Sequence, residues 1–413
     1  RDLPGYEDEL CAGDPPSADA FEGLIVACRR GNPAGRVVTG FNVHSGGAAG
    51  MVMYNLPLQD ALSDNHWLPA IHLPDGTDFV AFVEAHDGVT GSFTPSEKRD
   101  GQPDVVAAFS SRGPAGGFVK PDVSAPGVQI LAGTTPTPES TVEGPPGEYF
   151  QAIAGTSMSS PHVAGAGLLL AALHPDWTPG QIRSALMTTA VTELVKEDLT
   201  TPADPFDDGS GRIDLDAAMD PGLTLDETAA NYLALTEDPV TAPNLNIPSI
   251  NVPELPGRIT TTRTFTNVGG ATATYRVRTT APEGSSITVS PATFTVASGA
   301  SRTLTITIES TNDGGQEFGS IELTAVGRRA LHLPVAFVPQ QTGVSVTTAC
   351  DPGEVAVGDT TECTVTVVND GYAPTTVSAT TRTSTEARVT GASDPTTVTG
   401  SRTASVAPVE LAG

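Results

Sequence analysis

The stretch GTSMSSPHVAG at residues 155–165 decides how this chain is interpreted. Thr156 is a plausible N-cap, and small residues followed by leucines predict a helix after it. Ser157 would then lie at the helix N-terminus, where backbone N–H groups lack intrahelical acceptors and the helix dipole is positive. This environment suits the negative charge that develops on a substrate carbonyl during acyl transfer. Ser157, with the backbone of Gly155 and Thr156 beside it, is therefore a candidate nucleophile.

A serine nucleophile needs a base, and His162 is the histidine closest to Ser157 in the sequence. Five residues turn a helix by about 500°, so the two side chains would point about 140° apart. We therefore expect His162 to be a packing residue and not the base. An α/β-hydrolase elbow is excluded, because its Gly-x-Ser-x-Gly motif requires glycine where Ser159 stands.

The composition limits the partners that the chain can bind. The 413 residues carry a formal net charge of −27. This argues against nucleic acid, whose phosphates require a basic face, and equally against an anionic membrane surface. We see no apolar run of membrane-spanning length and expect no membrane insertion.

The length allows about two to four domains. The sequence begins with Arg1 and not with a methionine, so we expect an N-terminal segment to be missing.

The first half of the chain has an α/β pattern. In residues 20–98, the apolar runs GLIVACRRG (23–31) and MVMYN (51–55) predict strands, while 36–50 and 75–86 have helical spacing. The pattern continues through residues 99–230. There Thr178, Pro179 and Gln181 form an N-cap, a first-turn proline and a capping-box partner, which predicts a second helix after the serine helix.

The second half of the chain has an all-β pattern. After a proline-rich linker at 231–256, RTLTITIES (302–310) alternates apolar and polar residues and predicts a β-sandwich over 257–340. CTVTVVNDG (363–371) alternates in the same way and predicts a second sandwich module over 341–413, whose closing strand is not evident.

The four cysteines fall in two close pairs, Cys11 with Cys28 and Cys350 with Cys363. Neither pair has the Cys-x-x-Cys spacing or the neighbouring histidines of a zinc site, so we expect two disulfides. Each would contribute about 3 kcal/mol through loop entropy. Four buried thiols are the alternative. Disulfides favour an extracellular, secreted or cell-surface location.

GTSMSSPHVAG resembles the nucleophile motif of the subtilisin-like serine proteases, in which the serine follows Gly-Thr. This resemblance implies a secreted serine endopeptidase that acts on polypeptides without a cofactor. It also implies that residues 99–230 are the C-terminal part of a doubly wound parallel-sheet α/β domain. Further stretches resemble the family in the same order: FSSRGP (109–114), KPDVSAPGVQILAG (120–133), HPDWTPGQIRSALMTTA (174–190) and GSGRIDLDAAMDPGL (209–223).

The resemblance extends to the flanking domains. Residues 20–98 look like the protease-associated α/β domain that is inserted in many large secreted subtilases, with 1–19 as the connection from a missing half. Residues 257–340 look like their fibronectin-III-like domain. The tail at 341–413 resembles β-sandwich repeats of bacterial surface proteins.

The chain departs from the family in its other catalytic residues. Subtilases carry the aspartate in an Asp-Thr-Gly-type motif and the histidine in His-Gly-Thr-His, and these and the oxyanion-hole asparagine lie N-terminal to the inserted domain. None of these motifs is present among residues 1–413, and VHSGG (43–47) is the nearest look-alike. We therefore expect a fragment that has only the nucleophile, is inactive alone and exposes apolar surface. We expect the histidines of the inserted domain to be surface or satisfied residues: His44, His66, His72 and His86.

The acidic stretch ADPFDDGSGRIDLD (203–216) is a candidate calcium site, because carboxylate oxygens suit calcium. Its spacing is not that of an EF-hand, so we expect a solvated loop and assign no metal ligand, although structural calcium stays open. The aspartates concerned are Asp204, Asp207, Asp208, Asp214 and Asp216.

Two functions remain open from the sequence. One is the C-terminal portion of a secreted serine endopeptidase. The other is a non-catalytic adhesion or scaffold protein with a degenerate protease remnant. The retention of Gly155, Thr156, Ser157 and Pro161 favours the first, because a degenerate site has no chemical reason to keep its nucleophile.

Overall fold

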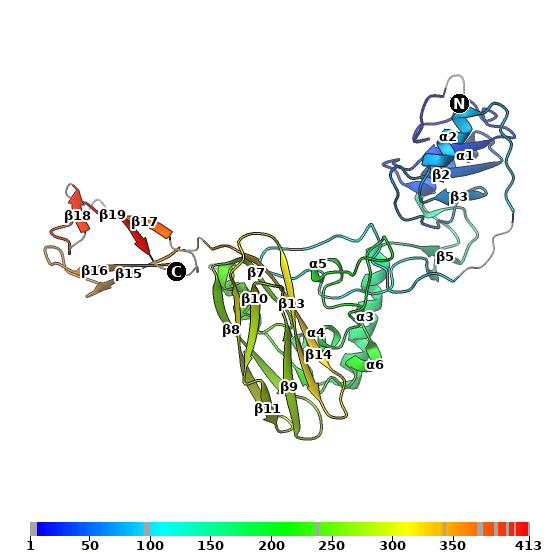
Figure 1. Ribbon diagram of the computed structural model, residues 1–413. Helices are drawn as coiled ribbons and strands as arrows, with labels where there is room; N and C mark the ends of the chain where they lie inside the picture. The colour runs from blue at the N-terminus through cyan, green and yellow to red at the C-terminus, as the bar shows by residue number, and fades with distance from the viewer. Residues whose placement is uncertain are drawn as a thin grey trace.

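The computed structural model describes residues 6–94, 100–236, 239–341, 344–369, 375–383, 387–393, 396–399 and 402–411. Three parts follow one another along the chain (Figure 1): an N-terminal α/β unit, a serine-bearing segment packed on a β-sandwich, and a C-terminal β module. No helix in these ranges is both long enough and apolar enough to cross a membrane.

The N-terminal unit is a three-stranded parallel sheet in the order β1-β2-β3, with α1 between β1 and β2 and α2 after β3. Phe21, Val43, Met51 and Met53 fill its core together with the Cys11–Cys28 disulfide. β1, β2, α1 and α2 fall where the hydrophobic spacing predicted them. They are β1 (Ile25–Arg29), α1 (Arg36–Ser45), β2 (Gly50–Tyr54), β3 (Ala70–Leu73) and α2 (Thr77–Ala85).

The serine-bearing segment is mostly helical. Its long helix packs through Ala166 and Leu170 against Ala185 and Leu186 of the next helix. That next helix begins with the predicted capping box between Thr178 and Gln181, an arrangement worth about 1 kcal/mol. The elements are β4 (Ile130–Gly133), η1 (Thr141–Glu143), β5 (Phe150–Ile153), α3 (Thr156–Leu173), α4 (Pro179–Thr188), α5 (Pro205–Asp208) and α6 (Leu215–Ala218).

The strands of this segment differ from the predicted parallel sheet. Within the described residues from 100 to 222, β4 and β5 form one antiparallel pair. Parallel pairing is limited to the bridges Val105–Val195 and Ser124–Arg212. A sheet interior requires neighbouring strands on both sides, so the α/β segment has its helices without the extended parallel sheet on which they would pack.

The β-sandwich consists of one sheet in the order β10-β12-β8-β6 and a second in the order β11-β9-β13-β14-β7. The alternating stretch 302–310 behaves as predicted, because Leu304, Ile306 and Ile308 are buried in the core. The strands are β6 (Leu223–Thr224), β7 (Ile250–Leu255), β8 (Arg258–Asn267), β9 (Ala273–Thr280), β10 (Ser285–Ser290), β11 (Thr293–Val296), β12 (Ser301–Ser310), β13 (Glu317–Ala325) and β14 (Leu331–Pro339).

The stretch expected to be a linker, 231–256, contributes to the sandwich instead of merely leading to it. It contains the end of α7 (Ala229–Ala234), the short helix η2 (Pro239–Asn244) and β7, which pairs in parallel with β14. The fully buried Arg263 of β8 donates hydrogen bonds to the carbonyls of Ile247 and Ser249 at 2.7 and 2.8 Å. Burial lowers the pKa of this guanidinium to about 9.

The C-terminal module contains two small sheets, β15-β16 and β17-β19-β18. Within 344–369, 375–383, 387–393 and 402–411, Ala404 is the one buried apolar side chain. The Cys350–Cys363 disulfide joins facing residues of β15 and β16, so both predicted disulfides are present. The strands are β15 (Val344–Asp351), β16 (Glu362–Asn369), β17 (Thr375–Arg382), β18 (Thr396–Thr399) and β19 (Thr403–Leu411).

Candidate active-site serine

Ser157 is exposed in the first turn of α3. The N-cap is Gly155, with an extended backbone, so the prediction of Thr156 as the N-cap is wrong by one residue. The N–H of Met158 bonds to the Gly155 carbonyl at 2.9 Å. The N–H groups of Thr156 and Ser157 precede the intrahelical bonds and point out of the positive end of the helix. The arrangement presents a hydroxyl and free backbone donors at one place.

A second loop supports the turn before Ser157. Gly127 accepts a hydrogen bond from the N–H of Gly155 at 2.8 Å. A Cβ atom at position 127 would lie 2.2 Å from Oγ of Ser159 and 3.0 Å from the Gly155 carbonyl oxygen. A methyl group at 127 would displace the Ser159 hydroxyl and press on the Gly155 carbonyl, so the close approach of the two loops favours glycine at 127. The sequence analysis did not single out Gly127, although it lies in the stretch 120–133 on which the resemblance rests.

His162 is not placed to act on Ser157. Its Nδ1 donates to the Met158 carbonyl at 2.8 Å, within its own helix. The ring is exposed, so the expectation of a packing residue was wrong. The rejection of His162 as the base is consistent with this geometry, because the ring is turned back along α3 and held there.

The four histidines of the N-terminal unit fall into three classes. His44 and His86 are exposed. His72 is satisfied by Asn55 Oδ1 at 2.8 Å and by the backbone at residue 62. His66 is an exception to the expectation, because its Nδ1 is buried without a hydrogen-bond partner among the described residues. Burial is the main cause that lowers the pKa of both His66 and His72.

The two remaining histidines bind backbone carbonyls far from Ser157 in the sequence. His174 stacks on Trp177 and bonds to the Met219 carbonyl at 2.8 Å. His332 of β14 bonds to the Ser210 carbonyl at 2.7 Å. In the described part of the chain, none of the seven histidines makes a hydrogen bond to Ser157.

The acidic stretch 203–216 is not a solvated loop at its centre, which corrects that expectation. Asp207 and Asp208 are each 5% exposed. The Asp207 carboxylate pairs with Lys196 at 2.9 Å and with Arg112. No cation among the described residues pairs with Asp208, and burial together with Asp207 and Asp204 raises its pKa to about 7. Within the described residues, no group of three or more acidic, His or Cys side chains is arranged to hold a metal ion.

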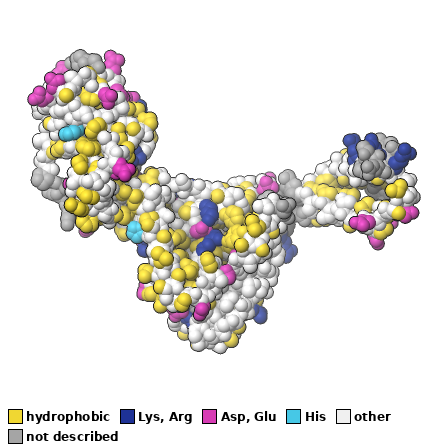
Figure 2. Space-filling model, turned by 180° about the vertical axis from the view of Figure 1, so that it is seen from behind, with side chains coloured by type: hydrophobic (Ala, Val, Ile, Leu, Met, Phe, Trp, Pro, Cys, Tyr) yellow, Lys and Arg dark blue, Asp and Glu magenta, His cyan; other side chains and the backbone are white. Residues whose placement is uncertain are grey.

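Large apolar side chains are exposed both on α3 and on the β4–β5 hairpin. Leu168 and Leu169 of α3 are 73% and 59% exposed, and Leu131 and Phe150 of the hairpin are 71% and 66% exposed. Figure 2 shows hydrophobic side chains gathered on the central part of the molecule. Large exposed apolar patches on a monomeric protein usually mark an interaction site.

The sandwich and the serine-bearing segment share an interface. β6 follows α6 and pairs with β8, which places Leu223 in the sandwich core. Ser184 of α4 accepts a hydrogen bond from the Leu225 N–H at 2.9 Å, and Phe206 packs edge to face on Phe318. The sandwich therefore supports α4, and α4 supports the helix that carries Ser157.

Two groups of known proteins match this chain. Residues 71–212 match the model described as the subtilase family, and residues 244–337 match the model of a fibronectin type-III domain. The first match begins in β3, inside the stretch predicted as an inserted domain. Among solved structures, the secreted serine protease VesC from Vibrio cholerae has a TM-score of 0.22 and 18% identity, over 30% of this chain and 24% of that one.

Curated relatives are plant proteases. Subtilisin-like protease SBT1.6 of Arabidopsis thaliana is 33% identical over 384 residues, which are 81% of this chain and 50% of that protein. SBT1.7 of the same plant is 36% identical over 374 residues, 79% of this chain and 49% of that protein. The chain thus spans about half the length of these curated relatives.

Proposed function

Because residues 71–212 are a segment of the subtilase family and are joined to a fibronectin type-III-like domain, we propose that this chain is the C-terminal portion of a secreted serine endopeptidase. Ser157 is its acyl-enzyme nucleophile. The observation that carries the proposal is the exposed Ser157 hydroxyl at the N-terminus of α3, beside a Gly155 turn that fits closely against Gly127.

The reaction assigned to this site is acyl transfer. Ser157 Oγ attacks the carbonyl carbon of a peptide bond, and its own backbone N–H donates to the oxyanion that forms. The leaving amine departs with a proton, and water then hydrolyses the acyl-enzyme. Removing one oxyanion donor from a serine protease typically lowers kcat by about 10²–10³-fold, so a hole with only backbone donors would be incomplete.

The base, its orienting aspartate and an oxyanion asparagine are proposed to come from an N-terminal segment of the parent protein. Two observations support this. The chain spans half the length of its relatives, and none of its histidines makes a hydrogen bond to Ser157 within the described residues. The exposed leucines of α3 and the β4–β5 hairpin would be the surface on which that segment packs.

The flanking parts take supporting roles in this proposal. Residues 20–98 form a protease-associated domain, which contacts the serine-bearing segment where the Trp67 indole donates to the Thr141 carbonyl at 3.3 Å. Substrates are polypeptides and no cofactor takes part. The two disulfides support an extracellular location.

The test is active-site labelling of the full-length parent protein with a fluorophosphonate. Ser157→Ala should abolish labelling, because the nucleophile is removed. His162→Gln should leave most of the labelling intact, because that ring bonds only to its own helix. Circular dichroism would establish that both variants are folded. Loss of labelling in a folded His162 variant, with labelling retained in the Ser157 variant, would refute the assignment.

A further inference from the structure

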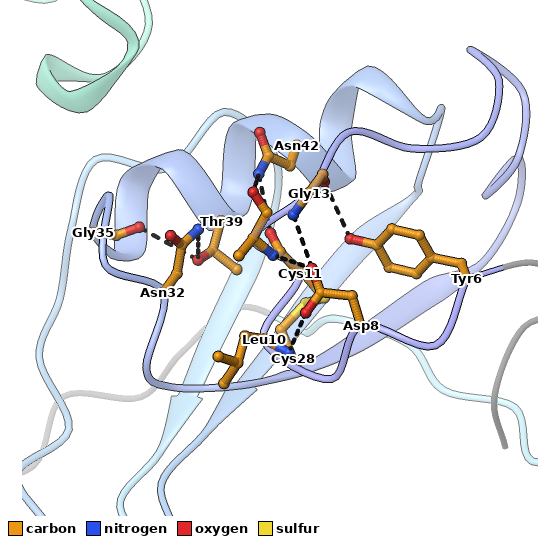
Figure 3. The surroundings of a disulfide bond; sticks show 11 residues. Tyr6, Asp8, Leu10, Cys11, Gly13, Cys28, Asn32, Gly35, Thr39 and Asn42 are labelled. Carbon is orange, nitrogen blue, oxygen red and sulfur yellow. Dashed lines mark hydrogen bonds between the residues drawn. A yellow bond between two sulfur atoms is a disulfide. The ribbon is translucent and has the colours of Figure 1, made fainter.

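The two disulfides have opposite surroundings. Cys11 and Cys28 are 1% and 0% exposed and lie in the core of the N-terminal unit. Figure 3 shows the Cys11 loop closed over by Asp8, and by Asn42 from α1. Cys350 and Cys363 are exposed on neighbouring strands. Thiol–disulfide exchange requires a thiolate to reach a sulfur atom of the bridge. We therefore expect the exposed bridge to exchange faster than the buried one.

The exposed bridge lies in a negative field. Asp351 and Glu362 follow and precede the two cysteines, and they face each other in the β15–β16 ladder. Glu354 and Asp359 lie in the loop that connects the strands. Residues 344–369 contain no Lys, Arg or His, and none of these four carboxylates has an ion pair with any described residue.

We propose that Cys350–Cys363 is a thiol-exchange site that reacts preferentially with cationic thiols, or with reductants that approach with a basic face. A thiolate of the reagent attacks one sulfur, the Cys350–Cys363 bond breaks, and the other cysteine leaves as a thiolate. A second reagent thiolate attacks the mixed disulfide. The reagent ends as its own disulfide and the protein as a dithiol, so two electrons pass from reagent to protein. The local carboxylates repel an anionic thiol and attract a cationic one.

Reduction of this bridge would loosen the β15–β16 ribbon. Ala404 is the one buried apolar side chain among residues 344–369, 375–383, 387–393 and 402–411, so little core holds the ribbon. Asp351 and Glu362 are like charges directly opposite each other, which disfavours pairing at that end. The disulfide cross-links the two strands beside their connecting loop 352–361, whereas the Cys11–Cys28 bridge is surrounded by a packed core.

The experiment uses the full chain with two small thiols, cysteamine and 2-mercaptoethanesulfonate, at rates normalised to thiolate concentration. Alkylation and peptide mass mapping would follow each bridge. At low ionic strength, Cys350–Cys363 should react about tenfold faster with cysteamine, and the ratio should approach about two in 1 M salt. Cys11–Cys28 should react at least about a hundredfold more slowly with both thiols. Amide exchange should then show faster exchange across 344–369 and no change in β1–β3.

Matched variants isolate the charge. Glu362→Gln should lower the cysteamine preference, whereas Glu410→Gln removes one negative charge from β19 of the other sheet and should leave the preference unchanged. Equal rates for the two thiols at low salt, or equal effects of the two variants, would overturn the charge selection. Reduction of both bridges at the same rate would overturn the site itself.

Discussion

Gly127 lies beside the proposed nucleophile helix and Gly165 lies within it, and their surroundings differ. A Cβ at 127 would collide with Ser159 Oγ and press on the Gly155 carbonyl oxygen, whereas a Cβ at 165 would have no neighbour within 4 Å. Neither position has a positive φ, so backbone strain plays no part. Comparing alanine substitutions at the two positions therefore tests the close contact between the loop at 127 and the turn before Ser157.

Gly127→Ala is therefore expected to destabilise the chain by about 1–3 kcal/mol, because a backbone carbonyl must shift to admit the methyl group. Gly165→Ala should instead stabilise α3 by up to about 1 kcal/mol, since alanine is the better helix former. Urea unfolding midpoints of both variants, followed by circular dichroism, test the pair. A Gly127 variant as stable as the parent chain would show that the two loops are not in close contact.

At single residues, the sequence could predict chemical type better than environment. The position of Ser157 at a helix start followed from the pattern around it, and so did the exclusion of His162 as its base. The N-cap was assigned to Thr156 because its side chain can cap, but Gly155 adopts the extended backbone and takes that place. The lack of a partner for His66 Nδ1 depends on packing around residue 40, which no local pattern encodes.

At the scale of elements, the short helix α5 shows how burial changes the pKa of a carboxyl group. Asp207 lies among cations, whereas Asp208 on the same turn does not. The Asp208 pKa rises from 3.8 to about 7, mainly through burial. The folded chain thus binds a proton that the unfolded chain releases between these values, and the free energy of unfolding falls as pH rises from about 4 to 7.

Asp208→Asn should remove this penalty. The variant should be more stable than the parent chain above pH 7, by up to about 4 kcal/mol at about 1.4 kcal/mol per pKa unit, and the difference should vanish towards pH 4. Asp176→Asn, at an exposed position, is the control and should show no such trend. Urea unfolding between pH 4 and 8 measures both. A difference that is independent of pH would contradict the proposed protonation of Asp208.

Elements were predictable where apolar residues recur with a regular period. The alternation in 302–310 predicted a strand with one buried face, and the helical spacing in 75–86 predicted a helix, although that helix buries none of its side chains fully. The prediction of a linker at 231–256 was wrong, because the prolines there were taken as the sign of an unstructured connection. In the structure, Pro253 lies within β7, which is held against β14 on one side only. A proline is compatible with such an edge strand, because its missing N–H can face away from the ladder.

At the scale of the whole molecule, α3 is packed against its neighbours over only part of its surface. One side of α3 packs on α4 and, through α4, on the sandwich. Leu168, Leu169 and Leu173 of the same helix are exposed to solvent. A helix that is apolar nearly all round is normally buried on both sides. Under the proposed function, the uncovered side is where the segment with the catalytic base packs.

Residues 1–413 alone should therefore have no peptidase activity. We expect residues 1–413 to cleave no casein or peptide substrate and to take up no fluorophosphonate at Ser157, because an unactivated serine hydroxyl is a weak nucleophile. The same chain should bind the apolar dye ANS, and Leu168→Glu with Leu169→Glu should reduce that binding by at least about half. Leu58→Glu, at an exposed leucine of the N-terminal unit, is the control and should leave most dye binding unchanged. Turnover by the chain that Ser157→Ala abolishes would mean that a base for Ser157 lies within these residues.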